Sequence, residues 1–215
     1  MFNKVNLCID NTLLYNEEKY IIENLINNNK NNLKYLDRSH QPIKDIGFYI
    51  DMIRKQNIIN DLHIFAHGSE NGLQIAGNLI NEEYLLKNAD DLESWKLQNL
   101  YLWSCQIGKN QKLIKLLSQL TGANVFFSKH NISRENTSIF NNEGDEMNLN
   151  QMVDRQVIQN WNGCLSVPSN LNVRRAFVNF YPPNSTARSD FWESYTDGSK
   201  ILMNALKWVS GNNAN

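Results

Sequence analysis

Apolar runs of four or five residues recur along this chain, and each of them ends abruptly at a polar residue or at glycine. Longer stretches with apolar residues at helical spacing separate the runs. The runs do not alternate between apolar and polar residues, which is typical of strands that are covered on both faces. The order of strand, helix and strand therefore predicts an α/β fold with a mostly parallel central sheet.

Each element is expected within definite limits. The predicted strands cover residues 5–9, 33–36, 62–66, 100–103 and 125–127. The predicted helices cover residues 17–26, 42–55, 82–96 and 112–120. The second helix has Pro42 in its first turn, and Gly122 is expected to cap the last one. Residues 131–150 are polar and are predicted to form a long surface loop.

The chain is expected to contain one main domain and an extension. Residues 1–165 hold all the predicted strands and helices of the sheet, and residues 166–172 have the composition of a linker. A strand at residues 174–181 and a final helix are expected after it. Residues 166–215 thus form a C-terminal strand–helix extension, which either packs on the sheet or is released by cleavage in the linker.

Charge and hydropathy exclude several classes of protein. The 215 residues include 21 basic and 22 acidic side chains, so no electrostatic attraction to nucleic acid is expected. No apolar stretch is long enough for a membrane span, and no N-terminal signal peptide is recognisable. A cytoplasmic location is the default expectation, and export without an N-terminal signal stays open. The 35 Asn residues suggest an AT-rich bacterial genome.

The three cysteines, Cys8, Cys105 and Cys164, form neither an even set nor a CxxC pair. A disulfide framework and a cysteine-based zinc site are therefore not expected, and no metal or cofactor is predicted. Cys8 and Cys164 are interpreted as thiols without a role. A lone buried cysteine most often behaves as a small apolar residue, so Cys105 needs a second observation before it counts as a catalytic candidate.

That second observation is the position of Cys105 relative to His67. In parallel sheets the chemistry lies at the carboxyl ends of the strands. His67 follows the strand at 62–66, and Cys105 follows the strand at 100–103. A thiol beside an imidazole is the minimum arrangement for cysteine nucleophilic catalysis. The backbone N–H groups of Gly68 and Cys105 are expected to line an oxyanion hole.

Two neighbouring polar residues have competing interpretations. His63 lies inside the strand at 62–66, too deep for the cleft mouth, and is predicted to be a packed histidine. Asp10 ends the first strand, where it either lies near the cleft mouth or caps the next turn. A histidine at a strand end also has a purely structural explanation, which applies to His67.

Several blocks of the chain together resemble caspase-like cysteine peptidases, a group that includes caspases, metacaspases, legumain, gingipains and separase. The blocks are Leu62-His-Ile-Phe-Ala-His-Gly-Ser69, Gly72-Leu-Gln-Ile75, Leu100-Tyr-Leu-Trp-Ser-Cys105 and Leu117-Ser-Gln-Leu-Thr-Gly-Ala-Asn-Val125. The similarity covers about residues 4–164 and is greatest to a bacterial caspase-like domain of unassigned function, found at the N-terminus of large surface proteins. The resemblance implies a three-layer caspase-like sandwich with His67 as general acid/base and Cys105 as nucleophile.

The chain departs from the closer family after the strand at 125–127. That family has an acidic pair where this chain has Ser128, Lys129 and His130. If these residues, together with Asp10, line the substrate pocket, the residue before the scissile bond (P1) is expected to be acidic or neutral instead of basic. The other interpretation is that Lys129 and His130 are solvated loop residues.

The sequence thus predicts a cysteine endopeptidase that acts on a protein or peptide substrate, which is either a partner or the chain itself. The alternative is a catalytically silent interaction or targeting module of the same fold. A third class, the amidotransferase-like cysteine hydrolases, is disfavoured because their nucleophile precedes the histidine along the chain, whereas His67 precedes Cys105 here.

Overall fold

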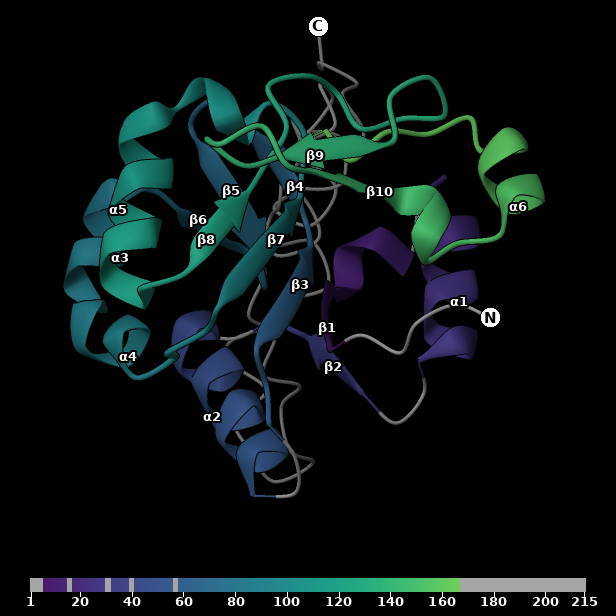
Figure 1. The fold of residues 1–215 in the computed structure, drawn as a ribbon. Helices are drawn as coiled ribbons and strands as arrows, with labels where there is room; N and C mark the ends of the chain where they lie inside the picture. The colour runs from purple at the N-terminus through teal and green to yellow at the C-terminus, as the bar shows by residue number, and fades with distance from the viewer. Residues whose placement is uncertain (1–5, 15–16, 30–31, 39–40, 56–57, 167–215) are drawn as a thin grey trace, which may run out of the picture. The chain divides into compact units, whose positions relative to one another are not determined.

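A computed structural model describes residues 6–14, 17–29, 32–38, 41–55 and 58–166 (Figure 1). The strand predicted at residues 174–181, the final helix and nearly all of the predicted linker lie outside these ranges. Ser166 is the last residue described.

Five parallel strands form the central sheet. They are β1 (Leu7–Asp10), β2 (Leu33–Leu36), β3 (Asp61–Phe65), β7 (Asn99–Trp103) and β8 (Asn124–Phe126). Their order in the sheet is β2-β1-β3-β7-β8, and every neighbouring pair is parallel. The predicted α/β fold with a parallel central sheet is therefore confirmed. All five strands lie within one or two residues of their predicted positions.

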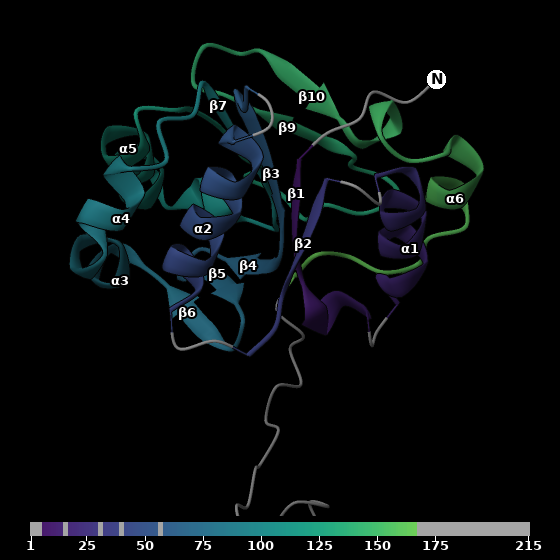
Figure 2. The ribbon, with the colours of Figure 1, turned by 90° about the horizontal axis from the view of Figure 1, so that it is seen from below.

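Helices cover both faces of this sheet. On one face lie α2 (Pro42–Arg54), α3 (Glu82–Lys87), α4 (Ala89–Glu93) and α5 (Gln111–Thr121) (Figures 1 and 2). On the other lie α1 (Lys19–Asn28) and α6 (Arg155–Gln159). The described residues thus form three layers. None of the helices among them is long and apolar enough to cross a membrane.

Neighbouring residues of each strand enter two different apolar clusters. Cys8 and Ile64 pack with the side chains of α2, α4 and α5, whereas Ile9 and Phe65 pack with those of α1 and α6. Successive side chains of a strand point to opposite faces, so a sheet covered on both sides needs apolar residues at every position. This is the physical reason why the inner strands of the sheet appear in the sequence as mostly apolar runs without alternation.

The structure differs from the prediction in three places. The helix expected at residues 82–96 is divided at Asn88, whose side-chain amide donates to the carbonyl of Tyr84 and competes with the helical hydrogen bonds. Residues 67–80 form an antiparallel sheet of β4 (His67–Ser69), β5 (Gly72–Ile75) and β6 (Asn78–Ile80). The loop expected at 131–150 contains the antiparallel pair β9 (Ser138–Phe140) and β10 (Glu146–Asn148).

Candidate active site

The two chain segments that carry His67 and Cys105 meet at the carboxyl ends of β3 and β7. These strands are adjacent, with Phe65 opposite Trp103. A Cβ atom at Gly68 would overlap Oγ of Ser104 and lie 3.1 Å from the carbonyl oxygen of Cys105. Only glycine lets the chain after His67 approach the Cys105 segment this closely.

Two backbone N–H groups converge on one oxygen at this point. Gly68 and Cys105 each donate to the carbonyl of Leu165, and both N···O distances are 3.2 Å. The N–H of Leu165 in turn donates to the carbonyl of Ile132 at 3.1 Å. The two groups that the sequence assigned to an oxyanion hole are therefore close together and point at a peptide carbonyl.

The Cys105 thiol is enclosed. Its side chain has no exposed surface, and the N–H of Ile132 donates to its Sγ at 3.1 Å. Burial raises the pKa of this thiol to about 12, and the neighbouring Cys164 thiol acts in the same direction, while the Ile132 N–H opposes them. In this arrangement Cys105 is protonated at neutral pH.

The residue after the thiol has an unusual backbone conformation. Gln106 has a φ of 57°, in the left-handed region that residues other than glycine seldom adopt. Its N–H donates to the carbonyl of His130 at 3.0 Å, and the N–H of Gly108 donates to the carbonyl of Ser128 at 2.9 Å. These hydrogen bonds fix the turn after Cys105 against the loop that follows β8.

His67 is buried, with only 4% of its surface exposed. Neither ring nitrogen hydrogen-bonds to another described residue. Burial lowers the pKa of the imidazole, and the Asp10 carboxylate and the backbone of Ser166 oppose this effect to a smaller extent. Burial thus favours the neutral form of this imidazole, which is the form that a general base requires.

Asp10 holds the end of β1. Its carboxylate accepts the N–H of Thr12 at 2.8 Å and the N–H of Ala76 at 2.5 Å. The capping interpretation of this residue is therefore confirmed. Its negative charge also raises the pKa of His67.

The loop after β8 borders a cavity of about 300 Å³. Ser128 is buried in its wall, whereas Lys129 and His130 are exposed, and β9 supplies much of the remaining lining. Asp10 is not among the lining residues. Three of the four predicted pocket residues thus share one cavity, next to the turn that carries Cys105. That it binds substrate stays a prediction.

His63 lies in the core. Trp103 Nε1–H donates to Nδ1 of His63 at 3.0 Å, and the Tyr101 ring stacks on the imidazole with centroids 4.2 Å apart. Burial lowers the pKa of His63 to about 3. The prediction of a packed histidine is confirmed.

A family model described as "Domain of unknown function (DUF4347)" matches residues 16–165, well over half of the chain. The chain belongs to this family. No curated protein and no solved structure matches the chain. The DUF4347 region includes both His67 and Cys105, and it extends to Leu165, whose carbonyl lies between the two N–H groups.

Within the DUF4347 domain, the sequence did not predict that residues 164–166 enter the site. Cys164 and Leu165 end the predicted main domain, and Ser166 begins the predicted linker. From the sequence, no role is expected for Cys164. Cys164 is half-buried, its Sγ lies 2.8 Å from Oγ of Ser166, and its thiol acts on that of Cys105. Within residues 161–166 the structure buries Trp161 and Leu165, and these two apolar residues are the sequence signal for burial of the segment.

Proposed function

We propose that this chain is a cysteine endopeptidase of caspase-like fold, with Cys105 as nucleophile and His67 as general acid/base. His67 takes the proton of the Cys105 thiol, and the thiolate adds to the carbonyl carbon of a peptide bond. The N–H groups of Gly68 and Cys105 stabilise the resulting oxyanion. The C–N bond then breaks, and His67 gives its proton to the departing amine. Water hydrolyses the resulting thioester, which restores the thiol.

One observation carries this proposal. The Gly68 and Cys105 N–H groups donate to the same carbonyl oxygen, each at 3.2 Å. Paired backbone donors that point at a peptide carbonyl, beside a cysteine and a neutral histidine, are what acyl transfer to a thiol requires. The family resemblance of the sequence assigns the same residues to these roles.

A second observation favours the alternative of a catalytically silent interaction or targeting module. The Cys105 thiol is fully buried and its pKa is raised to about 12, so little nucleophilic thiolate is present at neutral pH. In our proposal this state is latent toward other substrates, and His67 takes the thiol proton only when the bound carbonyl is attacked. Cys164 contributes to the high pKa of Cys105 and belongs to the segment whose carbonyl fills the site, so departure of that segment opens the thiol to water.

Acyloxymethylketone probes with varied P1 residues distinguish the two functions. We expect a probe to label the full-length chain covalently, and peptide mapping to place the label on Cys105. Cys105→Ala abolishes labelling, whereas the matched control Cys8→Ala, which alters a buried thiol on the opposite face of the sheet, retains it. If the chain is folded and no probe in the panel labels it, the result supports the catalytically silent module.

A further inference from the structure

The segment that ends at Ser166 lies in the candidate active site as an added strand. Cys164 pairs with Ser133 in an antiparallel bridge, and Ser166 pairs with Gly68 in a parallel one. Between them the N–H of Leu165 donates to the carbonyl of Ile132 at 3.1 Å. An extended peptide that adds to a strand edge in this way is a common form of peptide recognition.

Within this strand, the Leu165 carbonyl is the group that faces the reacting residues. Its oxygen accepts the two N–H groups of Gly68 and Cys105. The backbone of Leu165 also lowers the pKa of the Cys105 thiol, and the backbone of Ser166 raises the pKa of His67, each to a smaller extent than burial acts in the opposite direction. The N–H of Cys105 donates to the Leu165 carbonyl, and Ser166 pairs with Gly68, the residue after His67, so the Leu165–Ser166 bond lies between the two segments that carry the reacting residues.

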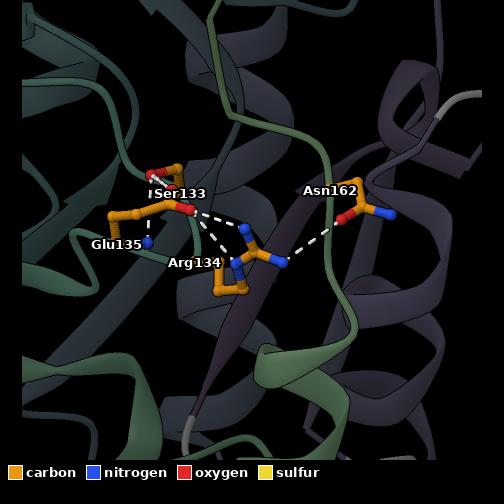
Figure 3. A network of polar contacts seen from close by, with 4 residues as sticks. All are labelled: Ser133, Arg134, Glu135 and Asn162. Carbon is orange, nitrogen blue, oxygen red and sulfur yellow. Dashed lines mark hydrogen bonds and ion pairs between the residues drawn. The ribbon is translucent and has the colours of Figure 1, made fainter.

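A polar network at the surface connects the loop after β8 to the segment that leads into the added strand. Arg134 donates to Oε1 of Glu135 at 2.9 Å and to the side-chain oxygen of Asn162 at 3.4 Å (Figure 3). Ser133 donates to the other carboxylate oxygen of Glu135 at 2.9 Å. The network links the loop after β8 to the approach of the segment, three residues before Leu165.

The side chain of Leu165 identifies what the site accepts. It is 2% exposed and belongs to the same buried apolar cluster as Phe65, Trp103 and Ile132. A charged side chain at this position would lose its hydration without a compensating partner in that apolar cluster. The position immediately before the bond is therefore suited to a leucine or a similar apolar residue.

We infer that the chain cleaves itself between Leu165 and Ser166, with leucine as the P1 residue, and so releases the segment that begins at Ser166. This inference rests on the proposed peptidase function and adds its substrate.

The reaction balances with water as the only co-reactant. Cys105 Sγ bonds to the Leu165 carbonyl carbon while His67 takes the thiol proton. The C–N bond to Ser166 then breaks, and the imidazolium gives this proton to the departing amine. Water adds to the Leu165 thioester, which leaves a carboxylate on Leu165 and restores the thiol.

Mass spectrometry of the intact full-length chain during incubation tests the inference. We expect two products, one that ends at Leu165 and one that begins at Ser166, and neither of them from Cys105→Ala. Because the segment lies in the site of its own chain, about tenfold dilution leaves the half-time unchanged. A half-time that rises in proportion to dilution would show cleavage between chains and contradict the inference.

Two substitutions of Leu165 test the P1 residue. Leu165→Asp is expected to slow cleavage about 100-fold or more, because the carboxylate cannot be buried in the apolar cluster. Leu165→Met, the matched control, is expected to stay within about tenfold of the parent chain. Thermal unfolding of both variants is measured alongside. If Leu165→Asp fails to fold, the cleavage rate of Leu165→Met and the mapped cleavage site of the parent chain still test whether Leu165 is the P1 residue.

The outcomes separate the two proposals. Cys105-dependent cleavage at Leu165 supports both. A chain that the probes label at Cys105 but that stays intact, or is cut at another bond, overturns the inference and leaves the peptidase proposal standing. A chain that is neither labelled nor cut overturns both, and cleavage at Leu165 that persists in Cys105→Ala has another catalyst and overturns the inference.

Discussion

Mild acid is expected to destabilise the domain through His63, a residue outside the candidate site. In the folded chain His63 accepts the Trp103 indole N–H at 3.0 Å and stacks on Tyr101. Burial lowers the pKa of His63 from 6.5 to about 3. Below pH 6.5 the unfolded chain therefore binds a proton that the folded chain does not.

The sign and size of the effect follow from proton linkage. The contribution of neutral His63 to stability is fully present above pH 6.5 and is lost as the pH falls from 6.5 toward 3. The free energy of unfolding decreases by about 1.4 kcal/mol for each pH unit in this window. Acidification from about pH 7.5 to about pH 5 should thus cost about 2 kcal/mol through this one group.

Urea unfolding followed by tryptophan fluorescence measures this loss. The chain carries Cys105→Ala so that it keeps one length, and it is compared with and without His63→Gln, whose amide oxygen is able to accept the Trp103 N–H. We expect His63→Gln to reduce the loss between the two pH values by about 2 kcal/mol. His130→Gln, which replaces an exposed imidazole, should leave the loss unchanged. Equal losses with and without His63→Gln would refute the reasoning.

Two further changes test the candidate site. Gly68→Ala should destabilise the fold by about 1–3 kcal/mol, because the new methyl group overlaps Ser104 Oγ. In thermal unfolding, adding Ser104→Ala should recover part of this loss. An undiminished melting temperature for Gly68→Ala would contradict the close approach of the two segments. Asp10→Asn removes the charge that raises the pKa of His67, so the acid limb of the self-cleavage rate should move to lower pH, and an unmoved limb would show that Asp10 acts only as a cap.

The parallel sheet was predictable because it is buried on both faces. Its inner strands are short and mostly apolar, and the edge strand β2, which has Lys34 and Tyr35 exposed, still lies at its predicted residues, Leu33–Leu36. The ends of β3 and β7 then indicated His67 and Cys105 without any knowledge of the contacts. By contrast, β4, β6, β9 and β10 have three residues each and are only partly buried, so no apolar run marks them in the sequence. β8 is as short, but the apolar run at residues 125–127 marks it.

The occupation of the site by Leu165 could not be predicted from the sequence. It depends on contacts with Gly68 and Cys105, which are far away along the chain and come close only through the packing of the sheet and loops. Leu165 stands directly before the predicted linker at 166–172, and its apolar side chain does not reveal which surface it covers. The division of the helix at Asn88 could not be predicted either, because asparagine occurs inside helices as well as at their ends.

The covalent tether between the site and residues 163–166 has a consequence for any other substrate. A segment held on a short linker competes at an effective concentration in the millimolar range. A free peptide at about 10 μM would therefore be outcompeted roughly 100-fold while the segment stays in place. If the chain cleaves itself as proposed, multiple turnover on other proteins begins only when its own new C-terminus has left the site.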